Sequence, residues 1–202
     1  MKRLNPTLLT VLAVAFTVPA VAQQTPSTVT GDAPTVSSVA PVKDLFGKTA
    51  DVHRFSGRTA TVLLFILRDC PIANAYAPEF DRIVNDFSRK KVTFYLVYAD
   101  SDIPTAELRR HYREYGYHCS ALSDSQRTLA RRWKAQRTPE AVVIDRAGKV
   151  VYQGRIDDRY VDFGKARHLP SRRDLRLVLD ALTENRPVAP TTTSVIGCSI
   201  PD

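Results

Sequence analysis

Thr61-Val-Leu-Leu-Phe-Ile-Leu67 leads directly into Arg68-Asp69-Cys70-Pro71, and this stretch decides the fold. Its first part is a continuous apolar run of strand length, as expected of a central strand that is covered on both faces. Pro71 suits the first turn of a helix, because the N–H group that proline lacks would have no partner there. The stretch therefore predicts a buried strand that passes through Cys70 into a helix.

Strands and helices are predicted to alternate along most of the chain. After Pro71, apolar residues fall on one helix face at Tyr76, Phe80, Ile83, Val84 and Phe87. Further strands are expected at residues 49–53, 92–98 and 119–122, and a hairpin at 141–145 and 149–153. Further helices are expected at 106–115 and 124–133. This order predicts an α/β fold with one mixed central sheet and helices on both of its faces.

The C-terminal part is predicted to hold one more helix, followed by a tail. Ser171 and Asp174 have the spacing of a capping box, which marks a helix start. The buried face of this helix is expected to consist of Leu175, Val178, Leu179 and Leu182. Everything after Asn185 is a tail rich in proline and threonine.

The N-terminus has the pattern of a secretory signal peptide. Lys2 and Arg3 precede an apolar stretch over residues 8–20, and small residues lead to a cleavage point between Ala22 and Gln23. The apolar stretch is shorter than the roughly 20 residues that a membrane span needs, so no stable span is expected after cleavage. An uncleaved single anchor is the alternative. We therefore expect a periplasmic or secreted protein, in an environment where thiols can be oxidised.

The chain is expected to consist of four parts. Residues 1–22 form the signal peptide and 23–41 a flexible leader rich in Thr, Ser, Pro and Val. The folded domain covers residues 42–184, and 185–202 form the Pro/Thr-rich tail, which carries Cys198. The length suits a single domain with short extensions.

Composition excludes several classes of protein. With 44% hydrophobic and 25% charged residues, the chain is not collagen-like, fully disordered or a multi-span membrane protein. The formal net charge of +8 permits weak contact with nucleic acid, but no nucleic-acid motif is present and no such binding is expected. The three cysteines are too few for a disulfide scaffold, and the four histidines have no metal-ligand spacing with them. No metal and no cofactor are therefore expected.

Cys70 lies where reactive groups gather in an open α/β sheet, at the end of a strand and the start of a helix. The helix dipole and its unpaired N–H groups favour a thiolate and lower the pKa of the cysteine. We expect the sulfur to be partly exposed. Thr138-Pro139 precedes the hairpin and would lie at the same sheet edge if the next strand runs antiparallel to the central one. A cis X–Pro bond there would place a bare backbone edge against the sulfur.

These features resemble the thioredoxin superfamily, in particular extracytoplasmic redoxin-domain proteins of the alkyl hydroperoxide reductase/thiol-specific antioxidant type. The resemblance covers about Val42 to Glu184. Its landmarks are Cys70-Pro71, Thr138-Pro139-Glu140 and Gly154-Arg-Ile-Asp-Asp158. It implies a thioredoxin-like fold, a nucleophilic Cys70 and a cis-proline at Pro139, with Thr138 beside it.

The sequence also departs from three known activities of this superfamily. Cys70-Pro71-Ile72-Ala73 lacks the second thiol of a Cys-x-x-Cys motif. Leu63 and Leu67 stand where a peroxiredoxin carries the Pro and Thr of Pro-x-x-x-Thr-x-x-Cys. The Cys-x-x-x-Cys pair of copper-delivery relatives is missing too. The resemblance therefore implies the fold more firmly than the activity.

A lone reacting thiol needs a second group that releases it. Cys119 begins a predicted strand and is expected at the opposite sheet edge, about 13 Å away, whereas a disulfide needs Cα atoms within about 7 Å. It is expected to be a small buried residue. Cys198 lies on a tail that reaches up to about 45 Å. It could return to Cys70 of its own chain or cross to a partner subunit in a homodimer, or it could be free or paired elsewhere.

Three carboxylates near the expected reactive edge allow two interpretations. Asp157 and Asp158 follow the second strand of the hairpin, and Glu140 adjoins Pro139. They could accept a proton from Cys70 or orient a water molecule. The structural interpretation, which we favour, is a loop pair that is solvated or capped by nearby arginines.

Two hypotheses of function follow from these residues. The first is an extracytoplasmic thiol oxidoreductase in which Cys70 reacts with protein disulfides or a small peroxide and Cys198 acts as the resolving thiol. The alternative is a non-catalytic thioredoxin-fold module that docks a protein partner or copper. The missing second active-site thiol motivates this alternative.

Overall fold

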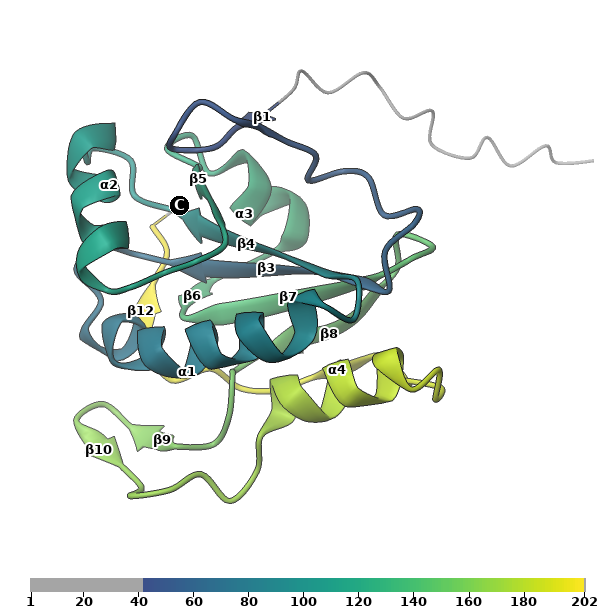
Figure 1. Cartoon of the computed structure of the whole chain (residues 1–202). Coiled ribbons are helices and arrows are strands. Elements are labelled where there is room, and N and C mark those ends of the chain that lie inside the picture. The colour runs from purple at the N-terminus through teal and green to yellow at the C-terminus, as the bar shows by residue number, and fades with distance from the viewer. Residues whose placement is uncertain (1–41, 202) are drawn as a thin grey trace, which may run out of the picture. The chain divides into compact units, whose positions relative to one another are not determined.

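A computed structural model describes residues 42–201, and their central feature is a six-stranded mixed sheet (Figure 1). Across the sheet, the strands are β11 (Thr191–Thr192), β8 (Val150–Gly154), β7 (Glu140–Asp145), β3 (Ala60–Ile66), β4 (Val92–Tyr98) and β5 (Ser120–Ser123). β3 runs parallel to β4 and antiparallel to β7. The expected signal peptide and leader lie outside the described residues.

Four helices and three two-stranded ladders complete the described part of the chain. The helices are α1 (Pro71–Ser88), α2 (Thr105–Glu114), α3 (Thr128–Trp133) and α4 (Asp174–Thr183). The ladders are β1 (Val42–Lys43) with β2 (Thr49–Ala50), β9 (Tyr160–Asp162) with β10 (Lys165–Ala166), and β6 (Arg137–Thr138) with β12 (Cys198–Ser199). The predicted α/β fold is confirmed.

The strand β3 is buried along its whole length because both faces of the sheet are covered. Val62, Leu64 and Ile66 point into one hydrophobic cluster, which α1, α2 and α4 close. Leu63 and Phe65 point into a second cluster, closed by α3 and the segment before β3. A strand buried on both sides needs apolar residues at every position, which explains the unbroken run in the sequence.

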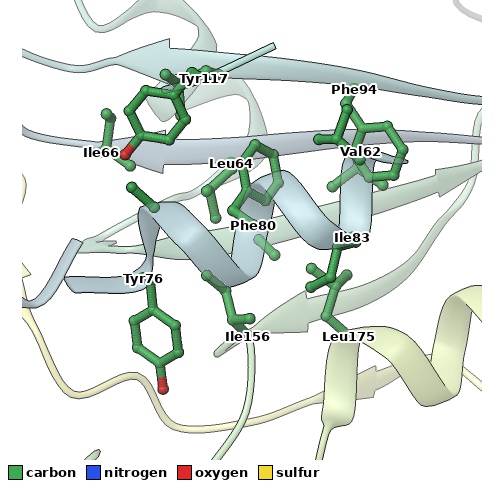
Figure 2. Close-up of a cluster of buried hydrophobic side chains, with 14 of the residues drawn as sticks. Val62, Leu64, Ile66, Tyr76, Phe80, Ile83, Phe94, Tyr117, Ile156 and Leu175 are labelled. Carbon is green, nitrogen blue, oxygen red and sulfur yellow. The ribbon is translucent and has the colours of Figure 1, made fainter. Parts of the chain in front are cut away.

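The helix α1 packs on the first of these clusters with the face that its period predicts. Its residues Tyr76, Phe80, Ile83, Val84 and Phe87 are all buried. Figure 2 shows Phe80 and Ile83 packed against Val62 and Leu64 of β3, with Leu175 of α4 beside Ile83. The predicted passage from a buried strand through Cys70 into an amphipathic helix is therefore confirmed.

The start of α4 differs from the expected capping box. Ser171 lies before the helix, and its backbone N–H donates to the carboxylate of Asp158 at 2.7 Å. Asp174 is buried and forms ion pairs with Arg155 at 2.7 Å and Arg172 at 2.6 Å. Two arginines therefore hold the carboxylate that the spacing assigned to a helix cap, and the helix begins without a side-chain cap.

The chain after Asn185 is not a plain tail. Its first part forms β11, which extends the central sheet parallel to β8. Its second part forms β12, which pairs with β6. At the other end of the domain, the strand expected at 49–53 is reduced to β2. Within residues 42–201, no helix has both the length and the apolar character that crossing a membrane would require.

Candidate active site

Cys70 occupies the junction between β3 and α1, as predicted. β3 ends at Ile66, and the backbone N–H of Cys70 donates to the carbonyl of Leu67 at 3.1 Å. The residue has extended backbone angles and directly precedes Pro71, the first residue of α1. Its thiol donates a hydrogen bond to the carbonyl oxygen of Thr138 at 3.3 Å.

Thr138 and Pro139 reach Cys70 because β7 runs antiparallel to β3. Glu140, the first residue of β7, pairs with Phe65 near the end of β3. The two residues before Glu140 therefore lie at the edge of the sheet where Cys70 is found. The Thr138–Pro139 peptide bond is cis. Both the location and the isomer agree with the expectation from the sequence.

The strand β12 brings Cys198 to the same edge. It pairs antiparallel with β6, with Cys198 opposite Thr138 and Ser199 opposite Arg137. Figure 1 shows β12 beside β6, near the first turn of α1. Cys198 therefore lies opposite the residue whose carbonyl accepts the Cys70 thiol, and the three cysteines are free thiols in this structure.

Cys119 does not take part in this site. It lies just before β5, partly buried against the first hydrophobic cluster. Burial raises the pKa of its thiol to about 12. The residue lines a separate surface cavity together with Ser88 at the far end of α1 and Val92 at the start of β4. Of the two candidate partners, the fold therefore brings Cys198 to Cys70.

The two thiols of the site differ in their acidity. Burial raises the pKa of Cys70, but hydrogen bonds from the Cys198 thiol, the Thr138 hydroxyl and the Ala73 N–H outweigh it, so that the net pKa is lowered. Burial and the neighbouring Cys70 raise the pKa of Cys198 to about 12. Cys70 is therefore the thiol that ionises first, and Cys198 is the thiol that donates to it.

One expectation about Cys70 is wrong. We expected a partly exposed sulfur, but the residue is only 1% exposed and belongs to the hydrophobic cluster under α1. The strand position does place Cys70 at the sheet edge. The cover comes from the tail, in which Cys198 of β12 and Ile196, two residues before it, pack against the same cluster. In the tail sequence, only the cysteine itself and the glycine before it point to this contact.

The acidity of Cys70 gives a first testable prediction. Replacing Cys198 with alanine removes a hydrogen-bond donor to the Cys70 thiolate, so the pKa of Cys70 is expected to rise. The ultraviolet absorbance of the thiolate, followed against pH in the reduced chain, measures this change. The matched variant Cys119→Ala removes a thiol outside the site and is expected to leave the Cys70 titration in place. An unchanged titration in Cys198→Ala would contradict the contact.

Side chains from α1, α2 and β4 fix the loop before Cys70. The Arg68 N–H donates to both carboxylate oxygens of Asp100, at 3.2 and 3.1 Å, and the Arg68 carbonyl accepts from Asn74 Nδ2 at 2.9 Å. Asn74 Oδ1 lies 3.0 Å from His111 Nε2, and His111 Nδ1 lies 2.8 Å from the Tyr98 hydroxyl. Because Asn74 donates through Nδ2, His111 donates through Nε2 and accepts at Nδ1.

Burial shifts the pKa of two members of this network. Burial lowers the pKa of His111, which keeps the imidazole neutral, and burial raises the pKa of Asp100. Asn74, His111 and Asp100 were not predicted as site residues. They come from α1, α2 and the loop after β4, and no local sequence pattern connects them.

The three carboxylates near the edge have structural partners. Asp157 accepts from the Tyr76 hydroxyl, and Asp158 forms an ion pair with Arg167 at 3.2 Å. The backbone N–H of Arg172 lowers the pKa of Asp158. These contacts support the structural interpretation that we favoured.

Glu140 has a positioning role at the same edge. Its carboxylate accepts the backbone N–H groups of Gln136 at 2.9 Å and Arg137 at 3.0 Å, so it holds β6 in place. Gln153 of β8 donates to its other oxygen at 2.7 Å. Within residues 42–201, no cluster of three or more His, Cys, Asp or Glu residues is arranged to hold a metal ion.

Comparisons with known proteins agree with this geometry. Residues 20–166 match the family model named Redoxin. An uncharacterized conserved protein from Geobacillus kaustophilus is 29% identical, with a TM-score of 0.68 over 79% of this chain and 86% of its own. A hypothetical protein from Sinorhizobium meliloti 1021 is 23% identical, with a TM-score of 0.70 over 80% of this chain and 89% of its own.

A more distant likeness carries a functional description. A secreted disulfide oxidoreductase of Mycobacterium tuberculosis, described as homologous to E. coli DsbE, is 17% identical, with a TM-score of 0.51. The match covers 72% of this chain and 95% of that one. No curated protein matches the chain. The family match covers most of the sequence, and the chain therefore belongs to the Redoxin family and has a thioredoxin-like fold.

Proposed function

We propose that this chain is a thiol-disulfide oxidoreductase that acts on protein disulfides, with Cys70 as the nucleophile and Cys198 as the resolving thiol. The observation that carries the proposal is the register of β12, which places Cys198 opposite Thr138, the residue whose carbonyl accepts the Cys70 thiol at 3.3 Å. The two cysteines replace the missing Cys-x-x-Cys pair, because the second thiol comes from the tail instead of from α1.

The reaction is a sequence of two thiol-disulfide exchanges. The Cys70 thiolate attacks one sulfur of a partner disulfide, the partner S–S bond breaks, and the other partner sulfur leaves as a thiolate. Cys198 then gives its proton to that thiolate and attacks Cys70. This step breaks the mixed disulfide and leaves a Cys70–Cys198 disulfide, and the second partner sulfur leaves as a thiolate that takes a proton from solvent, so that the partner is released as a dithiol. Two electrons pass to the partner, and an external dithiol restores the reduced pair.

The acidity of the two thiols supports this order of attack. The nucleophile must be ionised, and the pKa of Cys70 is the lowered one. The raised pKa of Cys198, about 12, keeps its proton in place until the leaving sulfur can accept it. Cys70 and Cys198 therefore suit different steps of one reaction.

The surroundings of Cys70 favour a protein substrate over a peroxide. The edge of β6 holds an extended peptide strand against Cys70, which is the form in which a protein segment would reach it. Leu63 and Leu67 occupy the positions at which a peroxiredoxin carries Pro and Thr. A backbone edge that pairs with an extended strand is therefore present beside Cys70, while the peroxidase motif is not.

Reduction of insulin by the chain, with a small dithiol as electron donor, tests the proposal. Insulin reduction is expected in the wild-type chain and in the control variant Cys119→Ser, and it is expected to disappear in Cys70→Ser. Hydrogen peroxide consumption is measured in parallel and is expected to stay at background. Insulin reduction that survives in Cys70→Ser would contradict the proposal, and so would activity with peroxide alone.

We also infer that the chain works outside the cytoplasm. The charged start at Lys2 and Arg3 and the apolar stretch that follows support export, and one structural neighbour is described as secreted. N-terminal sequencing of the protein recovered from the periplasm or medium of a bacterial host tests this inference. A chain that begins at Gln23 is expected, and an uncleaved chain in the cytoplasm would contradict it.

A further inference from the structure

The tail strand closes the site against any external substrate. Cys70 is almost completely buried, and Cys198 of β12 lies opposite Thr138 and packs against the hydrophobic cluster that contains Cys70. In thiol-disulfide exchange the attacking sulfur must contact a sulfur of the disulfide directly. A partner disulfide therefore cannot meet Cys70 while β12 lies on β6.

The contacts that hold β12 are few. The strand pairs with β6 over two residues, and the Ile200 N–H donates to the Gln136 carbonyl at 2.9 Å. The remaining bonds to β6 are long: Arg137 donates to the Gly197 carbonyl at 3.3 Å and to the Ser199 hydroxyl at 3.4 Å, and the Thr138 hydroxyl donates to the Cys198 carbonyl at 3.5 Å. Ile196 and Ile200 are only partly buried. Segments with little buried apolar area and few backbone bonds open locally at low free energy.

The tail is fixed more firmly just before this segment. The Thr193 hydroxyl hydrogen-bonds to the Tyr152 hydroxyl at 2.7 Å and accepts the Arg155 N–H at 3.1 Å. Gly154 permits this close approach, because a Cβ there would lie 2.9 Å from the Thr193 nitrogen. Residues 194–201 can therefore separate from β6 as one unit that stays attached at Thr193.

β12 can pair with β6 in this register only because residue 197 is a glycine. A Cβ at Gly197 would lie 2.7 Å from the carbonyl carbon of Thr138 and still closer to its oxygen. Both atoms belong to backbone next to the site and cannot move aside cheaply. Only a residue without a side chain fits before a cysteine that lies opposite Thr138.

A cavity lies beside the tail at Ile200, two residues after Cys198. Ile200 and Pro201 line it together with Ala130 and Ala135, and its volume is about 440 Å³. Arg131 and Lys134 also line it. Ile200 packs against the second hydrophobic cluster, so an apolar residue at the same place in another segment of the same register would meet the same apolar surface.

We propose that β12 is a displaceable strand, and that the edge of β6 which it leaves receives an extended segment of a partner protein in the same register. That segment has glycine before its reacting cysteine and an apolar residue two positions after it. The inference rests on the proposed reaction of Cys70 and names the form of substrate that reaches it. Cys198 then resolves the mixed disulfide when β12 returns.

Alkylation of Cys70 by iodoacetamide tests whether β12 gates access. In the full reduced chain, Gly197→Val drives β12 off β6, and the initial rate of Cys70 alkylation, read by mass spectrometry of the Cys70 peptide, is expected to rise roughly tenfold to a hundredfold. The matched control Ser194→Val adds the same bulk at an exposed position and is expected to leave the rate unchanged. A second variant, Ile200→Ser, weakens the same strand without a clash and is expected to raise the rate less.

A peptide added in trans tests the partner segment. Val-Ile-Gly-Ser-Ser-Ile-Pro copies the tail with serine in place of cysteine, and it is expected to restore protection of Cys70 in the Gly197→Val chain. The same peptide with valine in place of glycine is expected to give no protection. Equal rates in all chains, equal protection by both peptides, or protection by neither would overturn the inference.

These measurements separate the inference from the proposed function. Alkylation and its protection report access to Cys70 and need no turnover. A chain that shows the expected alkylation but does not reduce insulin would contradict the proposed function alone. A chain that reduces insulin through Cys70 with alkylation rates unaffected by Gly197→Val would overturn the displaceable strand alone.

Discussion

Replacing Cys198 with serine is expected to turn the chain into a trap for the proteins that it reduces. Cys70 still attacks a partner disulfide, but no second thiol beside it breaks the mixed disulfide. A tethered thiol acts at an effective concentration that exceeds an external thiol by orders of magnitude. Steady-state reduction of insulin is therefore expected to fall roughly a hundredfold or more, while the covalent complex through Cys70 accumulates.

Non-reducing electrophoresis and mass spectrometry measure the trapped complex. Cys119→Ser is the matched control, because it also replaces a thiol with a hydroxyl but lies outside the site. It is expected to show normal turnover and no complex. The double variant Cys70→Ser, Cys198→Ser is expected to trap nothing. Turnover of Cys198→Ser equal to that of the wild-type chain at the same concentration of the dithiol donor would exclude Cys198 as the resolving group.

The part of the fold that carries Cys70 could be predicted from the sequence because its signals are local. The apolar run from Thr61 to Leu67 and the helical period from Tyr76 to Phe87 each depend on the burial of neighbouring residues. The placement of Thr138-Pro139 needed one further assumption, that β7 runs antiparallel to β3, and the register confirms it.

The structure of the tail could not be predicted in the same way. β11 and β12 are two-residue strands whose partners, β8 and β6, are adjacent to them only in the folded chain. Such short pairings leave no periodicity, and a Pro/Thr-rich composition favours an irregular segment. Two glycines carry the remaining signal: Gly154 and Gly197 stand where the tail passes too close for a side chain.

Two differences between the expected and the observed contacts have the same physical origin. Cys70 was expected to be partly exposed because its position on the sheet edge is open, but β12 covers it. Ser171 and Asp174 have capping spacing, but Arg155 and Arg172 bind the Asp174 carboxylate. In both cases a group distant in sequence takes over an interaction that the local pattern assigned elsewhere.

A substitution in the packing of α1 against the sheet is expected to have the largest effect on stability. Phe80 is fully buried, and its ring packs edge-on against two other rings (Figure 2). The distances between ring centroids are 5.9 Å to Phe94 and 6.4 Å to Tyr117. Phe80→Ala removes these contacts and leaves a cavity between α1 and β4. The free energy of unfolding is expected to fall by about 3–5 kcal/mol.

Chemical denaturation of the reduced chain measures this loss, and Leu177→Ala is the matched control. Leu177 lies on α4 with 53% of its surface exposed, so its truncation is expected to change the free energy of unfolding by about 0.5 kcal/mol or less. A cost below about 1 kcal/mol for Phe80→Ala would mean that α1 is not packed against β4 as described. Because Cys70 immediately precedes α1, the free energy of unfolding of Phe80→Ala also measures how strongly the sheet binds the helix that carries the reacting thiol at its start.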